Sequence, residues 1–325
     1  PDDIARAEAL ELLRTGDGRL LETEASHLAR ELTKRESFGT MEADGLRWVI
    51  QQGHDAVREE IVEAVSVRRE PDARLILAGL LLEGGVERIR KAFADERPSM
   101  RAAGAHATRL LVESGDLKDM QPAERGAVYD RLRPGLEVLS LDADEPSVSI
   151  RALIALAYIG EPGIVERLEQ LYHGGNFGVR LEVTKALGYI KGDAEAHRFL
   201  TRVMAEERKD TQSGALRAAA LESMARSQHQ DAVRLLRYYL LSDRDATVRE
   251  TAGRTLAEMG NDEARFALVE HLTGGEPDPE RRARLVDVLG RFEGEIVPPL
   301  LRRYLGDRDT RVRSAAALRA AGHNM

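Results

Sequence analysis

The chain has 325 residues, of which 42% are hydrophobic and 32% charged, with a formal net charge of −8 and no cysteine. The absence of cysteine excludes a disulfide framework, a Cys-ligated zinc or iron–sulfur site and a thiol nucleophile. The negative charge disfavours nucleic-acid binding over the whole surface, and no run approaches the roughly 18 apolar residues of a membrane span.

The first 145 residues show helical periodicity without a clear repeat. Apolar residues at helical spacing predict eight helices, over residues 3–14, 20–35, 42–52, 55–67, 73–82, 86–94, 100–113 and 122–141. Between residues 113 and 146, Gly115, Pro122 and Pro134 predict an insertion or a change of helix pitch, since proline disrupts a regular helix.

From residue 146 onward the sequence repeats. Leu241-Ser-Asp-Arg-Asp-Ala-Thr-Val-Arg249 and Leu305-Gly-Asp-Arg-Asp-Thr-Arg-Val-Arg313 each join an acidic turn to a helix opening with Val-Arg. The same arginine recurs six times, at Arg151, Arg180, Arg217, Arg249, Arg282 and Arg313. Its spacings of 29, 37, 32, 33 and 31 residues match the length of a two-helix hairpin.

Other residues follow the same register. Four residues before the arginines stand candidate helix N-caps: Ser147, Asn176, Ser213, Asp245, Asp278 and Asp309. Apolar residues at −1, +3 and +7 form one stripe along each first helix, and mostly small residues at +8 favour close helix packing. Second helices are predicted over 164–172, 194–204, 232–241, 264–272 and 296–305. Gly160, Gly192, Gly260 and Gly294 between the helices suit a left-handed C-terminal cap.

The residues from 146 to 325 resemble short bacterial HEAT repeats of the bilin-lyase type, an armadillo-like family. The acidic turn, the Val-Arg opening and Val179-Arg-x-x-Val-x-x-Ala-Leu-Gly188 carry this resemblance. It implies an all-α fold, a right-handed α–α superhelix in which each arginine bonds to acidic turn residues and the inner helices line a concave face. Val57-Arg58 and Met100-Arg101 are imperfect copies of the Val-Arg opening. They favour a degenerate helical part, residues 1–145, that is continuous with the regular repeats of residues 146–325.

Positions +2, +5 and +9 of the first helices estimate the concave surface. They give the candidate partner-binding residues Glu182, Lys185, Tyr189, Glu222, Arg226, Arg254, Glu258, Arg284, Asp287 and Arg291. The same register adds Leu153, Leu156, Thr251 and Leu318. Because the charges alternate in sign, they favour a charged polypeptide over a phosphate-rich ligand, although ordinary solvated helix pairs produce the same pattern.

No motif predicts a catalytic, metal or cofactor site. Gly-x-Ser-x-Gly and the phosphate-binding glycine loops are absent. The histidines, which show neither His-x-x-x-His nor His-Glu spacing, are His27, His54, His106, His173, His197, His229, His271 and His323. Deoxyhypusine hydroxylases, which have similar repeats, need His-Glu pairs to bind iron. Their activity is therefore not expected here.

We accordingly expect a non-enzymatic scaffold, bacterial and cytoplasmic, that binds another protein. The alternative is an enzyme of a HEAT-like class, a bilin lyase or an alkylpurine DNA glycosylase, although a single Trp48 counts against the glycosylase. Because the chain begins at Pro1, a removed signal segment and a periplasmic location stay open.

The last repeats are unusually basic. Residues 281–325 hold ten arginines against five acidic residues. This excess predicts docking of an acidic partner, head-to-tail stacking of chains, nucleic-acid binding by this end alone, or arginines with structural roles. A structural role is favoured for Arg313 from its place in the repeat, whereas Arg302, Arg303 and Arg308 stay undecided.

Overall fold

The computed structural model describes residues 20–34, 38–68, 70–114, 117, 119–207 and 214–322, and contains helices but no strand within them. The chain divides into two compact units, Pro1–Ile164 and Val165–Met325. The predicted helix at 3–14 lies outside the described residues. None of the described helices has the length and apolar character needed to cross a membrane.

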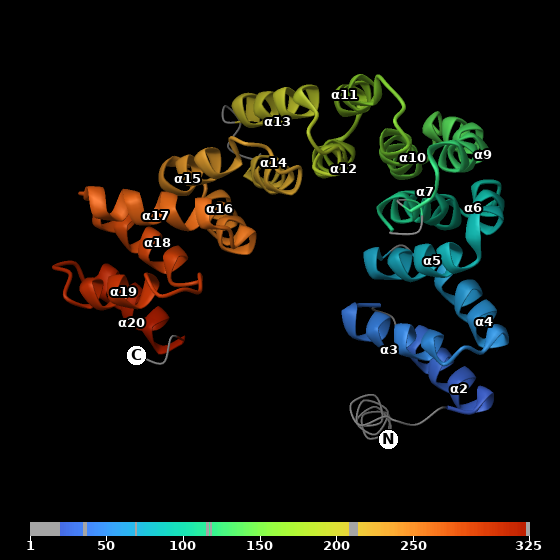
Figure 1. Ribbon diagram of the computed structural model, residues 1–325, viewed down its shortest axis with the longest axis horizontal. Coiled ribbons are helices and arrows are strands. Elements are labelled where there is room, and N and C mark those ends of the chain that lie inside the picture. Colours follow the sequence, from blue (N-terminus) through green and yellow to red (C-terminus); the bar gives the residue numbers. More distant parts are fainter. Residues whose placement is uncertain are drawn as a thin grey trace. The chain divides into compact units, whose positions relative to one another are not determined.

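The first unit is a stack of helices (Figure 1). They are α2 (Glu22–Thr33), α3 (Thr40–Gln51), α4 (Asp55–Ser66), α5 (Pro71–Glu83), α6 (Gly85–Phe93), α7 (Pro98–Glu113), α9 (Pro122–Ser140) and α10 (Pro146–Tyr158). Seven of the eight predicted N-terminal helices are thereby confirmed. Helix α7 packs against both α5 and α10, and α10 packs against α9. Helix α9 runs through Pro134, and the buried Phe93 of α6 packs closely against Gly135 of α9.

The second unit is a two-layered stack of hairpins (Figure 1). Its helices are α11 (Ile164–Gly174), α12 (Phe177–Leu187), α13 (Ala194–Glu207), α14 (Gly214–Arg226), α15 (Ala232–Ser242), α16 (Ala246–Met259), α17 (Asp262–Gly274), α18 (Pro279–Leu289), α19 (Val297–Leu305) and α20 (Thr310–Gly322). In one layer, α12, α14, α16, α18 and α20 each pack against the next. We call these the inner helices. The outer helices α13, α15, α17 and α19 each pack against the inner helices on either side. This packing confirms the two-helix repeat that the arginine spacing predicts.

Most predicted caps form. The side chains that accept backbone N–H groups are those of Asn176, Asp245, Asp278 and Asp309. The prediction for Ser147 is wrong because α10 begins one residue earlier, at Pro146, whose fixed φ favours the first helical position. Ser213 lies outside the described residues.

The turns between paired helices require a left-handed residue. Gly160, Gly192, Gly260 and Gly294 have φ of 86°, 70°, 59° and 123°, as predicted for glycine at a C-terminal cap. The turn after α14 uses Gln228 instead, with φ of 58°. It is the one residue other than glycine with positive φ in the described part of the chain.

Three of the repeat arginines bind the turns that precede them. The Nη1 groups of Arg249, Arg282 and Arg313 donate to backbone carbonyls five and six residues earlier, at 2.7–3.3 Å. Arg101 in the first unit makes the same pair of bonds, to Asp95 and Glu96. Arg101 is therefore a true copy of the repeat arginine, as its Met-Arg opening predicted.

Two glycines allow the inner helices to approach closely. A Cβ added to Gly188 would lie 2.7 Å from the Cα of Ser223 in α14, and one added to Gly290 would lie 2.3 Å from the Cβ of Arg319 in α20. Both occupy the small-residue position of the repeat. The prediction that this position serves close packing is confirmed at these two sites.

Candidate functional site

The ten residues predicted to bind a partner all come from the inner helices α12, α14, α16 and α18 or from the two residues that follow a helix end. None of them is buried. Lys185, Arg226, Arg254, Glu258 and Arg291 are exposed, and the other five are partly exposed. We refer to the solvent-facing side of these helices, together with α20, as the inner-helix face.

Three further residues of the predicted register do not belong to a surface. Leu153 and Leu156 of α10 are 1% and 0% exposed, and Thr251 of α16 is also buried. Helix α10 therefore buries a wider apolar stripe against α7 and α9 than the predicted positions −1, +3 and +7. Leu318 of α20 is exposed, as predicted.

Side chains on the inner-helix face contact each other from one hairpin to the next. The Arg226 guanidinium lies 4.9 Å from the centre of the Tyr189 ring, within cation–π range. Arg254 of α16 donates to Glu222 of α14 and, at 2.9 Å, to Glu258 of its own helix. These hydrogen bonds, that to Glu258 first, raise the pKa of Arg254 above its usual value.

The same arrangement recurs farther along the face. Asp287 of α18 accepts from Arg291 at 2.9 Å and from Arg319 of α20 at 2.8 Å. Bonds between residues about one repeat apart hold the long side chains in place, so the face presents ordered charges of both signs.

A shallow groove of about 460 Å³ lies between α16 and α18 and reaches Ala315 of α20. Its charged lining consists of Arg249, Arg284, Arg291, Glu250, Glu280 and Asp287. Its apolar lining includes Gly253 and Val288. These two residues lie close together, because a Cβ added to Gly253 would lie 2.7 Å from Cγ2 of Val288. The groove therefore combines an apolar lining with three cations and three carboxylates.

A second groove, of about 400 Å³, lies at the N-termini of α7 and α10 in the first unit. Its lining includes Arg68, Arg74 and Arg97. Two of these arginines are already paired with carboxylates, Arg68 with Glu70 and Arg97 with Asp95. The local excess of positive charge is therefore smaller than the number of arginines indicates.

Most arginines of the basic C-terminal segment are paired. Arg282 and Arg311 bind carboxylates, and Arg313 binds turn carbonyls, which confirms its structural role. By contrast, Arg302 and Arg308 are exposed and make no ion pair with a described residue.

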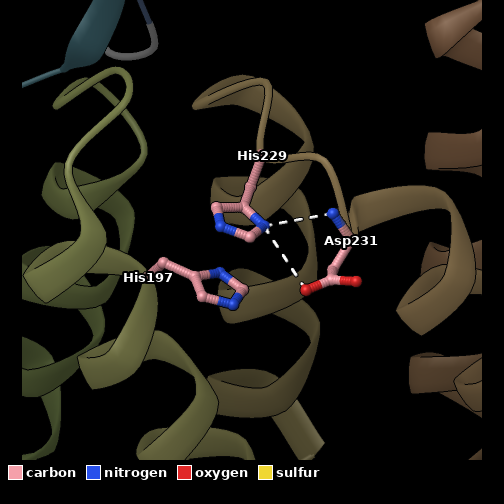
Figure 2. A group of neighbouring side chains, drawn as sticks. All are labelled: His197, His229 and Asp231. Atoms are coloured by element: carbon pink, nitrogen blue, oxygen red, sulfur yellow. Dashed lines mark hydrogen bonds and ion pairs between the residues drawn. The ribbon is translucent and has the colours of Figure 1, made fainter.

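Sequence reasoning missed one group of side chains, which is drawn in Figure 2. His197 of α13 and His229, in the turn after α14, stack with ring centres 3.3 Å apart and ring planes 3° from parallel. The Asp231 carboxylate lies 4.0 Å from His229 Nδ1, which also accepts the Asp231 backbone N–H. The available signal was the separation of 32 residues between the histidines, because it equals one repeat. A scan for spacings within a single helix cannot detect it.

Comparison with known proteins supports the fold. The family model for HEAT repeats matches residues 134–218 and 208–283. No curated protein matches the chain in sequence.

Solved structures show weak overall similarity to the chain. Human deoxyhypusine hydroxylase in complex with glycerol is 19% identical, with 83% of this chain and 98% of that chain covered and a TM-score of 0.31. An engineered protein is 20% identical, with 92% and 95% covered and a TM-score of 0.27. SYS-1 is 10% identical, with 94% and 64% covered and a TM-score of 0.31. The family matches lie on stacked helical hairpins, and residues 134–283 of the chain are HEAT repeats.

Proposed function

We propose that the chain is a non-enzymatic scaffold whose inner-helix face binds a segment of another protein. Stacked helical hairpins expose an extended surface while each hairpin buries its apolar stripe against its neighbours, and this surface is what repeat proteins use for recognition. The observation that carries the proposal is the recurrence of cross-hairpin contacts on one face, namely Tyr189 with Arg226, Glu222 with Arg254, and Asp287 with Arg319.

The chemistry of the face favours a polypeptide. Its guanidinium and carboxylate groups alternate, so it complements a ligand that carries both charges together with apolar side chains. A phosphate backbone would instead need a continuous run of cations. The groove between α16 and α18 supplies an apolar lining bordered by charges, which suits one inserted side chain of a bound segment.

Affinity capture with matched variants tests the proposal. The full chain serves as bait in an extract of its native cells, and captured proteins are identified by mass spectrometry. Lys185→Glu with Arg226→Glu reverses two exposed charges, and Ala246→Trp fills the groove from an exposed position. Arg254 is left unchanged, because reversing it would place a third carboxylate beside Glu222 and Glu258.

The control is Ala205→Trp, at an exposed position on the outer helix α13. We expect the wild type and this control to capture the same protein and the two inner-face variants to lose it. Equal capture by all four proteins would refute binding at the inner-helix face.

The C-terminal end supports a second, smaller contact. We propose that exposed Arg302, Arg303 and Arg308, on α19 and the turn after it, dock an acidic part of the same partner. Replacing these three arginines with glutamine should weaken capture and reduce its sensitivity to salt. Unchanged capture at every salt concentration would reject this contact.

A further inference from the structure

We propose that His197, His229 and Asp231 form a binding site for a divalent transition-metal ion of the zinc class. One ligand atom from each residue is available, and these atoms all lie within 4.8 Å of one another. Two imidazole nitrogens and one carboxylate oxygen are a donor set that Zn²⁺ accepts, with a fourth position left for water.

The local fold places each donor. His197 lies in the first turn of α13, next to the Asp193 carboxylate that accepts N–H groups at the start of this helix. The left-handed residue Gln228 reverses the chain after α14 and leaves His229 facing His197 (Figure 2). Asp231 is the N-cap of α15, yet its side chain caps no helical N–H.

The donors are close to coordination geometry. Zinc–ligand bonds of about 2.0–2.1 Å in a tetrahedral site separate neighbouring ligand atoms by about 3.3 Å. The observed limit of 4.8 Å is longer by about 1.5 Å, a distance that rotation of partly exposed side chains covers. The two imidazole rings must tilt relative to each other to bind one ion. In parallel stacked rings the nitrogen lone pairs point in parallel planes and do not converge on one point.

Existing contacts occupy only part of the donor set, because Nδ1 of His229 accepts the Asp231 backbone N–H. Nδ1 of His197 is buried and has no hydrogen-bond partner among the described residues, so one ring nitrogen is unsatisfied. The nearby cation is Arg234, which is itself exposed and bonds Asp231 Oδ1 at 3.2 Å. Oδ2 can bind the metal while Oδ1 keeps this bond, as second-shell partners commonly do.

Metal binding would join two repeats. His197 belongs to the hairpin of α12 and α13, whereas His229 and Asp231 belong to the turn between α14 and α15. The site is complete only when the two hairpins are stacked. Because the metal binds the folded state and not the separated hairpins, it should stabilise this part of the second unit.

Calorimetric titration of the untagged, chelator-treated chain with ZnCl₂ tests the site. We expect one Zn²⁺ per chain, and affinity at least tenfold lower in His197→Gln, His229→Gln and Asp231→Asn. The matched control is His173→Gln, which changes an exposed histidine of α11 and should bind as the wild type does. No binding by the wild type, or equal affinity in all variants, would overturn the proposal.

Cobalt gives a readout that does not depend on the variants folding. Co²⁺ bound to the wild-type chain should develop the intense visible absorption of tetrahedral coordination. Its displacement by Zn²⁺ should remove that absorption. A spectrum identical to that of aqueous Co²⁺ would contradict the proposal.

Discussion

Arg282 and Asp307 form a two-point ion pair between consecutive hairpins, with Nε 2.8 Å from Oδ2 and Nη2 3.0 Å from Oδ1. The hydrogen bonds from Arg282 lower the pKa of Asp307. Arg282 also donates through Nη1 to its own turn, and the Asp307 carbonyl accepts from Arg313 of the next repeat. One aspartate therefore links the arginines of two successive repeats.

The same relationship occurs at Asp243. Its carboxylate accepts two bonds from Arg217, and its carbonyl accepts from Arg249. In the first unit, Arg101 likewise donates to Asp142 of the following turn. The acidic turn and the Val-Arg opening recur together in the sequence because they are two halves of one connection between hairpins.

Removing one member of the buried pair should destabilise the second unit. Arg217 and Asp243 have side chains that are 6% and 2% exposed, so Arg217→Ala leaves a buried carboxylate without its cation. We expect a loss of about 3–5 kcal/mol in the free energy of unfolding, measured by urea denaturation with circular dichroism.

The matched control is Arg226→Ala on the same helix. Its side chain is exposed and contacts the Tyr189 ring, so the expected loss is at most about 1 kcal/mol. The double variant Arg217→Ala with Asp243→Ala should recover part of the loss, because no buried charge then remains unpaired. Equal effects of the two single arginine changes would contradict this interpretation.

His106 should make the chain sensitive to mild acid. Burial, followed by the charges of Arg109, Arg151 and Arg74, lowers its pKa to about 3. In the unfolded chain the pKa of His106 is near 6.5, so as the pH falls the unfolded state binds a proton at this residue before the folded state does. His106 therefore leaves stability unchanged above about pH 6.5 and reduces it as the pH falls toward 3, by about 2 kcal/mol at pH 5.

His106→Gln isolates this effect. Glutamine does not titrate, and its carbonyl can accept the bond that Arg109 donates to His106 Nε2 at 2.8 Å. Between about pH 7 and pH 5, the free energy of unfolding should fall by about 2 kcal/mol more in the wild type than in the variant. Parallel pH profiles would show that His106 takes up its proton without cost.

Gly188, the C-cap of α12, and Gly79, inside α5, should respond oppositely to alanine. Gly188→Ala places a methyl group against the backbone of Ser223, which cannot move without shifting α14, and should cost about 1–3 kcal/mol. Gly79→Ala in α5 meets no atom within 4 Å and should instead stabilise by about 0.5–1 kcal/mol. Thermal denaturation of both variants measures the difference. A loss in both would mean that the cost at Gly188 is unrelated to the close approach.

Gln228 should be a site of backbone strain. A side chain in the left-handed region costs about 1 kcal/mol, and the equivalent turns use glycine. Gln228→Gly should therefore raise the free energy of unfolding by up to about 1 kcal/mol, whereas Gln228→Val should lower it. Chemical denaturation of both variants checks the sign, and a stabilising valine would exclude strain at this turn.

The sequence predicted the fold because local and repeated signals agree. Asp245 and Asp278 cap helices where the register placed them, and Arg101 was identifiable from its Met-Arg opening. Ser147 was misassigned because the register extended a cap rule past a proline, and Pro146 determines the start of α10. Leu153 and Leu156 were misplaced because exposure depends on which neighbouring helices cover a face, and a register within one helix does not contain that information.

Contacts between side chains of different hairpins could not be predicted from the register of a single helix. Arg226 and Arg254 could be assigned to one face from their repeat positions, but their contacts with Tyr189 and Glu222 depend on stacking between hairpins. His197 becomes a neighbour of His229 only when one hairpin lies on the next. Function that is assembled across repeats is therefore visible in sequence only when positions are compared at the repeat length.

Site-specific photo-crosslinking in native cells tests recognition through the inner-helix face most directly. A photoreactive phenylalanine analogue replaces Ala246, beside the groove on the inner-helix face, or Ala205 on the outer helix α13. The proposed function predicts a crosslinked polypeptide from position 246 and none from position 205. Crosslinks of equal yield at both positions, or at 205 alone, would contradict recognition through the inner-helix face.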